Sequence, residues 1–322
     1  MTAFISIGIG KYDVDLIGAI NIIIDYITYG PSDSIPERVV FTQRIPRGIM
    51  AVIVGAGLAV AGAVMQSMLH NPLADPFTTG VSSGASLGAS VFVVLGIGLL
   101  PVSGTTGLVS NAFLFSLVPG FIILLLSVFK RITSTTMILI GIGVMYVFTA
   151  LTQLLRVIAT PQQMEQLYLW QLGSLSQSSF DNIVIVLAAV IVCIGLLYRF
   201  RTDLNLLGAG DKSALTMGTN PWSTRILCLI IVSLMTSVIV SFTGVIGFVG
   251  LVAPQIIRML IGSDNRYLIP ASATFGAMYL TVCDSLCRVI GSTGLPVGVL
   301  TAVIGSPLFL YLLVINSKKR TV

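Results

Sequence analysis

The stretch GIMAVIVGAGLAVAGAVMQSML, residues 48–69, contains no charged side chain and is long enough to cross a bilayer as a helix. A membrane helix needs about 20 predominantly apolar residues. Similar runs recur along the whole chain of 322 residues, of which 55% are hydrophobic and 9% are charged. Soluble domains carry about 25% charged residues. The composition therefore predicts a protein that crosses the membrane many times.

Nine apolar segments are candidates for membrane helices. They are residues 48–69, 81–100, 112–129, 137–157, 183–198, 226–244, 247–261, 268–286 and 297–315. The segment 247–261 is short and contains Pro254, so we expect it to be irregular and buried by its neighbours. Residues 1–30 are more amphipathic than spanning. We expect an all-α fold, a polytopic transmembrane bundle of about nine full spans, in a single domain over residues 1–322.

The basic residues predict the orientation, because cytoplasmic loops carry an excess of Lys and Arg. With the C-terminus in the cytoplasm, the inner side holds Lys130, Arg131, Arg199, Arg201, Lys212, Arg225, Arg258, Arg266, Lys318, Lys319 and Arg320. The outer side holds Lys11, Arg38, Arg44, Arg47, Arg156 and Arg288. The larger number of basic residues on the inner side favours this orientation. The arginines on the outer side run against the rule, so we expect them to have a specific function. Since these residues form no single basic patch, we expect no nucleic-acid partner.

Small residues recur every four positions on two of the expected spans. The two rows are Gly55, Ala59 and Ala63, and Gly80, Gly84 and Gly88. Such rows let helix backbones approach closely. We expect them to pack helices within one subunit rather than to form a dimer seam.

Several kinds of chemistry have no motif in this chain. There is no G-x-x-x-x-G-K-[ST] phosphate loop, so we expect no ATP site, and no convergent catalytic set that would indicate an enzyme. His70 is the only histidine, and the four cysteines lie inside apolar runs. Cys283 and Cys287 are four residues apart, which leaves a metal or redox role open, but packing is the simpler interpretation. We expect no cofactor and no metal site.

One short polar segment, LGAGDKSALTMG at residues 207–218, interrupts the apolar runs on what should be the cytoplasmic side. Gly208 and Gly218 can turn the chain sharply at its two ends. Between them we expect one or two short helical turns, with Asp211 near a helix N-terminus. Such a unit could fit a groove on a soluble partner. The alternative is an ordinary cytoplasmic loop.

This segment resembles the coupling segment of ABC-importer permeases. The similarity extends to RIPRGIMAVIVGAGLAVAGAVMQSMLHNPLADPFTTGVSSGASLGAS, WQLGSLS, GVIGFVGLVAPQIIR and LPVGVLTAVIGSPLFLYLL, and covers residues 8–313. These motifs look like the FecCD-type permeases, which import iron–siderophore complexes, haem or cobalamin. The resemblance implies a homodimer in the cytoplasmic membrane of a prokaryote. It also implies two cytoplasmic ATPase subunits and an extracytoplasmic substrate-binding protein as partners.

The resemblance also assigns roles to residues that match the family's motifs. Within a coupling loop at residues 199–225, the ATPase-coupling positions are Gly208, Asp211, Lys212, Ala214, Leu215 and Gly218. The binding-protein docking positions are Arg44, Arg47 and Arg288. The cytoplasmic gate positions are Asn71, Leu73 and, as a weaker match, Ser134.

Each of these roles has an alternative. The outer arginines could snorkel to lipid headgroups, and Arg288 could pair with Asp284 one helical turn before it. The segment HNPLADP, residues 70–76, should break the helix at Pro72 and Pro76, and could be a structural turn without a gating role. The alternative function is an ion-gradient-driven secondary transporter, which usually keeps an ionisable residue inside a span.

The chain departs from the family pattern at three places. Gln255 stands where the family usually has His, and Gly294 where it often has Glu. The family has ten spans, yet only residues 1–10 precede the region that follows its first span. Ten residues of helix cover about half the hydrocarbon thickness. Either the chain works with nine spans or its start is assigned late, and we expect the latter.

Overall fold

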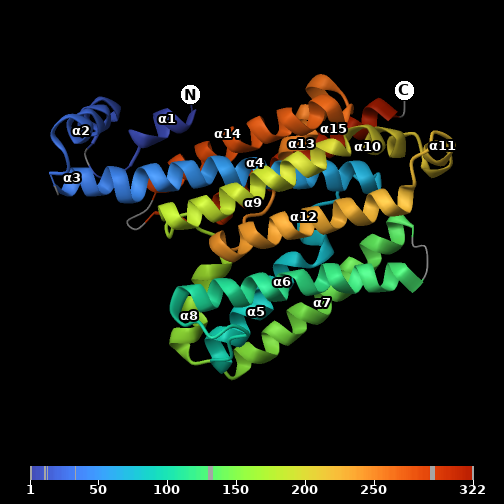
Figure 1. The fold of residues 1–322 in the computed structure, drawn as a ribbon, viewed down its shortest axis with the longest axis horizontal. Coiled ribbons are helices and arrows are strands. Elements are labelled where there is room, and N and C mark those ends of the chain that lie inside the picture. The colour runs from blue at the N-terminus through green and yellow to red at the C-terminus, as the bar shows by residue number, and fades with distance from the viewer. Residues whose placement is uncertain are drawn as a thin grey trace.

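The structure is a computed structural model that describes residues 2–10, 12, 14–32, 34–129, 133–290 and 294–320. All elements in these ranges are helices (Figure 1). They are α1 Thr2–Ile7, α2 Leu16–Tyr29, α3 Ile35–Arg38, η1 Val39–Arg44, α4 Ile45–Leu69, η2 Pro76–Thr79, α5 Val81–Leu95, α6 Gly104–Phe129, α7 Ser134–Val157, α8 Pro161–Gln171, α9 Phe180–Arg199, α10 Arg201–Gly208, α11 Asp211–Thr216, α12 Pro221–Thr243, α13 Val249–Ile261, α14 Asn265–Val289 and α15 Val297–Arg320. The all-α fold is confirmed. Three residues used for the orientation, Lys11, Lys130 and Arg131, lie outside the described residues.

Six helical stretches are long and apolar enough to cross a membrane. They are Ile35–Leu69, Gly104–Ser127, Ser134–Val157, Phe180–Arg199, Pro221–Thr243 and Val297–Val314. Two further expected spans correspond to shorter apolar helices, α5 and α13, and the span expected at 268–286 lies within the longer helix α14. The number of nine spans remains a prediction.

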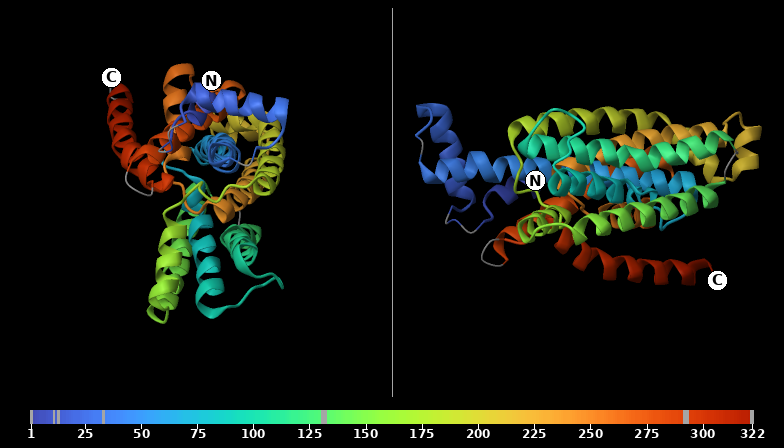
Figure 2. Two further views of the ribbon diagram at one scale, coloured as in Figure 1. Left: turned by 90° about the vertical axis from the view of Figure 1, so that its left-hand side faces the viewer. Right: turned by 90° about the horizontal axis from the view of Figure 1, so that it is seen from below.

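Helix α4 lies at the centre of the bundle. Within its candidate span, 83% of the most apolar window is buried inside the chain, compared with 17% for α7. Helices α9, α12, α13 and α14 pack around α4, and Figure 2 shows it enclosed by them in the end-on view. Helices α5 to α8 form a second group, joined to the first mainly through α12, while α15 packs on α13 and α14. A movement of α4 would therefore reach most of the bundle.

The rows of small residues pack helices within the chain. An ideal Cβ on Gly55 of α4 would lie 2.3 Å from the carbonyl oxygen of Gly276 of α14. One on Gly88 of α5 would lie 2.4 Å from the carbonyl oxygen of Asn111 of α6. The backbones meet at distances that admit no side chain, so both rows act inside one subunit.

Residues 247–261 were expected to be irregular and buried by their neighbours. The start is irregular, since Phe248 has a left-handed backbone with φ of 67°, and most of the following helix is buried. The rest of the segment is regular, contrary to the expectation. Helix α13 runs without a break from Val249 to Ile261, with Pro254 inside it. Proline cannot bond the carbonyl four residues earlier, which is that of Gly250. The side-chain Nε2 of Gln66 on α4 donates to this carbonyl oxygen at 3.3 Å. A neighbouring helix therefore satisfies the backbone group that Pro254 leaves free.

Candidate functional site

The predicted coupling loop, residues 199–225, contains a two-helix arm, α10 and α11, between α9 and α12. Helix α10 ends at Gly208. Helix α11 begins at Asp211, which confirms the expected short helix with Asp211 at its N-terminus. The arm lies at the end of the bundle opposite α1 and α2 (Figure 1). The glycines that turn the chain are Gly210 and Gly218, with φ of 99° and 86°. The turn expected at Gly208 was wrong, because Gly208 is still helical and the left-handed backbone falls two residues later.

Arg225, near the start of α12, holds the beginning of α11. Its Nη1 and Nη2 atoms donate to the two carboxylate oxygens of Asp211 at 2.8 and 2.6 Å, and its Nε donates to the carbonyl oxygen of Met68 at 2.9 Å. Arg225 is 4% exposed. These hydrogen bonds are the main reason that the pKa of Asp211 is below its ordinary value. The contact is therefore present at neutral pH and is lost only as the pH falls through that lowered pKa.

The outer face of the arm mixes charge with apolar side chains. Leu215 and Met217 are 58% and 63% exposed, and Lys212 is exposed beside them. Ala214, in contrast, is fully buried against the bundle. The sequence analysis did not include Met217 among the contact residues, although an apolar methionine in a polar loop indicates a surface that contacts a partner. It also missed the tie at the far end of the arm, where the Thr219 hydroxyl donates to Asp203 at 2.7 Å.

The segment after α4 leaves the helix at once. His70 has a left-handed backbone with φ of 52°, and the Asn71 carboxamide oxygen accepts from the Leu73 amide at 2.9 Å. Asp75 then caps η2 by accepting from the Phe77 amide at 2.7 Å. The helix break expected at HNPLADP is confirmed. Leu73 is 49% exposed at this turn.

Ser134, the weaker of the matches to a gate position, is the first residue of α7 and follows the cap residue Thr133. Helix α7 packs against η2. Since η2 directly follows the turn with Asn71 and Leu73, α7 packs next to that turn; the close approach is made by Gly141, two turns after Ser134.

At the opposite end of the bundle, Arg44 is an interior residue. It is 4% exposed, and its guanidinium donates to the carbonyl oxygens of Ile7, Tyr12 and Val14 at 2.9, 2.7 and 2.6 Å. The expectation that Arg44 presents its charge at the outer surface is therefore not met. Its guanidinium donates instead to the N-terminal segment, and no motif in the sequence indicated that this segment lies beside Arg44.

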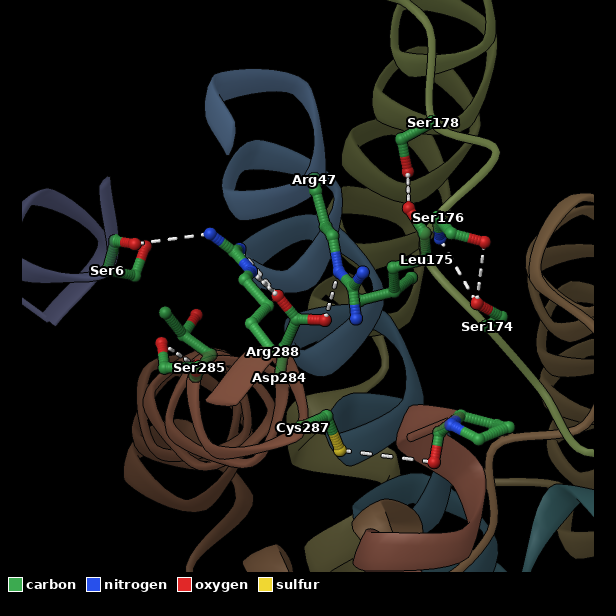
Figure 3. Close-up of polar contacts among 12 residues, drawn as sticks. Ser6, Arg47, Ser174, Leu175, Ser176, Ser178, Asp284, Ser285, Cys287 and Arg288 are labelled. Atoms are coloured by element: carbon green, nitrogen blue, oxygen red, sulfur yellow. Dashed lines mark hydrogen bonds and ion pairs between the residues drawn. The ribbon is translucent and has the colours of Figure 1, made fainter. Parts of the chain in front are cut away.

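Arg47 and Arg288 converge on one buried carboxylate (Figure 3). The Nε of Arg47 lies 2.7 Å from one oxygen of Asp284, and Nη2 of Arg288 lies 2.5 Å from the other. The Asp284 side chain is fully buried, that of Arg288 is 7% exposed and that of Arg47 is 17% exposed. The local pair of Arg288 with Asp284 is confirmed. With two guanidinium groups on one carboxylate, the cluster carries a net positive charge, and Arg47 is its most exposed member.

The structure shows the surroundings of Gln255 and Gly294, the two residues that depart from the family pattern. Gln255 is 4% exposed and its carboxamide oxygen accepts from Arg258 at 3.4 Å. Gly294 has a φ of 80°, a left-handed conformation that a glutamate would adopt only with strain.

A bundle of long apolar helices, with a short polar arm at one end and a positive cluster at the other, defines a multi-pass membrane transport subunit. The chain belongs to the FecCD transport family, whose model matches residues 1–315. It is thus the permease subunit of an ABC importer, a transport component of the cell membrane without an ATPase site of its own. It works with an ATPase and a binding protein. Family membership sets aside the ion-gradient alternative, because ABC importers use ATP.

Relatives and a solved structure cover nearly the whole chain. The hemin transport system permease of Yersinia pestis is 36% identical, with 86% of this chain and 84% of that protein aligned. The Fe(3+)-citrate import system permease of Bacillus subtilis is 34% identical over 96% of this chain and 90% of that protein. A solved metal-chelate type ABC transporter in an inward-facing conformation matches with a TM-score of 0.84 and 31% identity, over 97% of this chain and 94% of that one.

Proposed function

We propose that this permease moves an iron chelate of the siderophore or ferric-citrate kind, or haem or cobalamin, into the cell. The chelate class is supported by the relatives, which are named for hemin and for ferric citrate. The observation that carries the transport mechanism is the α10–α11 arm. A short helix that presents Lys212, Leu215 and Met217 is suited to a groove on a soluble subunit.

In this proposal the arm docks on the ATPase through the predicted positions Gly208, Asp211, Lys212, Ala214, Leu215 and Gly218. Lys212 and Leu215 contact the partner directly, since they are exposed. Asp211 and Ala214 act from the inner face by holding α11 in place. Gly208 ends α10 just before the turn at Gly210, and Gly218 lets the chain leave the arm after α11.

The gate is assigned to Asn71, Leu73 and Ser134. Leu73 is exposed at a non-helical turn, and a turn can change conformation without unwinding a span. Two copies of the chain would place two such turns around one pathway. A homodimer is supported by the apolar side chains that α7 and α15 leave exposed. They include Tyr146, Leu154, Val303 and Tyr311.

The outer cluster is assigned to docking of the binding protein. Arg47 would meet an acidic side chain of that protein, because it is the most exposed of the three predicted arginines. Arg288 would set the position of Asp284 between them. Arg44 would hold the outer end of α4 against the N-terminal segment.

Replacing Arg47 with glutamate should weaken docking of the binding protein at least about tenfold at low salt, since it reverses a charge at a docking surface. Arg47→Gln should have a smaller effect, and the binding rate should lose part of its salt dependence. Surface plasmon resonance with the full permease in nanodiscs measures both.

The control is Arg38→Glu, which makes the same charge change on an exposed residue of α3 at the same end of the protein. If the Arg38 and Arg47 variants weaken docking equally, only net charge matters. In that case the assignment of Arg47 is wrong.

The function is tested by reconstitution. The chain is co-expressed with its partner ATPase and binding protein, and the complex is placed in liposomes. We expect two permease copies and two ATPase copies by native mass spectrometry, and ATP-dependent uptake of haem or of iron-55 ferric citrate. A complex that hydrolyses ATP in response to its binding protein, but takes up no iron or cobalt chelate, would exclude this cargo class.

A further inference from the structure

We infer that Arg225 is a positioning residue that carries movement of the coupling arm to the end of α4, and that Asn205 and Asn265 form a second link to the same place. This inference rests on the proposed function, because it assumes that an ATPase moves the arm. It adds the residues through which that movement enters the bundle.

The first link begins at α11. Asp211, its first residue, is bound by two nitrogens of Arg225, and the third nitrogen of that guanidinium binds the Met68 carbonyl oxygen. All three distances lie between 2.6 and 2.9 Å. The guanidinium is planar and rigid, so it fixes Asp211 relative to Met68 in direction as well as in distance.

The second link begins at α10. The carboxamide oxygen of Asn205 accepts from the backbone amide and the side-chain nitrogen of Asn265, both at 2.8 Å. The side-chain oxygen of Asn265 accepts from the Ser67 hydroxyl at 2.9 Å. The Asn205 side-chain nitrogen also donates to Asp264 at 2.6 Å, which holds Asn205 at the start of α14.

The two links therefore end on adjacent residues of α4, Ser67 and Met68. These residues belong to the last turn of the central helix, and the non-helical turn with Asn71 and Leu73 follows directly. Asn265 is 2% exposed and Arg225 4% exposed, so water does not readily replace the bonds that they make with α4, whereas the Asp211 end of the first link is half-exposed. A displacement of either helix of the arm must move the end of α4 or break a buried polar contact.

The test uses a cysteine at Leu73 as a reporter in the complete complex of permease, ATPase and binding protein. Leu73 is exposed, whereas the four native cysteines are buried. The rate of labelling by a membrane-impermeant maleimide is measured without nucleotide and after trapping with ATP and vanadate. In the Leu73→Cys parent we expect a clear difference between the two rates.

In Arg225→Met that difference should shrink at least about tenfold, the factor by which loss of a charge-assisted hydrogen bond shifts an equilibrium. ATP hydrolysis and co-purification of the ATPase should persist, so the complex becomes uncoupled. Arg225→Lys, which can keep one contact at a time, should recover part of the response. Asn205→Ala should reduce it separately, and both changes together should remove it. If Arg225→Met does not fold, Asp211→Asn tests the same link.

The matched control is Arg266→Met, an exposed arginine at the same end of the bundle, which should leave the labelling response unchanged. A full nucleotide response in Arg225→Met that still hydrolyses ATP would overturn the inference, as would a parent that shows no response. Failure of the proposed function itself has a different signature: no ATPase then co-purifies with the unaltered chain.

Discussion

Replacing Gly62 with alanine should prevent α4 and α13 from packing and should leave little folded protein. An ideal Cβ on Gly62 would lie 1.8 Å from the carbonyl oxygen of Gly250 and 2.5 Å from its carbonyl carbon. Both neighbours are backbone atoms, so no side chain can rotate away. Overpacking of this kind costs about 1–3 kcal/mol or more. Here α13 would also lose the bond from Gln66 that offsets Pro254. Size-exclusion chromatography of a fluorescent fusion, followed by a thermal melt, measures the loss.

Gly195→Ala on α9 is the matched control, since an added Cβ there meets no heavy atom within 4 Å. It should behave like the unaltered chain, or be slightly more stable because alanine favours helix. A Gly62→Ala protein with an unchanged melting temperature would show that α4 and α13 do not cross as described.

The second large effect is expected for Asp211→Arg. The change removes the carboxylate that binds two nitrogens of Arg225 and places a like charge beside them. A lost hydrogen bond to a charged group costs about 1.5–3 kcal/mol, and the half-exposed position of Asp211 argues for the lower part of that range. The beginning of α11 should detach from α12. We expect ATP-dependent uptake to fall at least about tenfold while the bundle stays folded.

Asp181→Arg makes the same change of charge on an exposed residue in the first turn of α9, at the end of that helix opposite the arm. It should retain uptake. If both variants lose uptake equally, or if Asp211→Arg transports normally, the role of the Asp211–Arg225 pair is wrong.

The sequence was sufficient to locate the arm and the helix break after α4. A polar stretch between apolar runs is visible without a structure, and so are two prolines at the end of a span. These signals are local. The partner of Asp211 could not be found in this way, because Arg225 lies 14 residues away across a turn whose geometry depends on Gly210 and Gly218.

The errors at Arg44 and Pro254 share one physical cause, which is satisfaction of polar groups by distant parts of the chain. Arginine is usually a surface residue, but the guanidinium of Arg44 binds three backbone carbonyl oxygens that lie at least 30 positions away in the sequence. Pro254 predicted an irregular segment, but Gln66, 184 residues from Gly250, restores the missing bond. Neither compensation leaves a spacing pattern in the sequence.

The most direct measurement is uptake of a labelled chelate by liposomes that contain the complete complex, with residues 207–218 either intact or replaced by a glycine–serine linker of equal length. With the arm intact, uptake should require hydrolysable ATP. With the linker, uptake should cease although the permease remains folded. Uptake at the full rate through the linker variant, or in the absence of nucleotide, would contradict the claim that this arm couples ATP hydrolysis to the membrane helices.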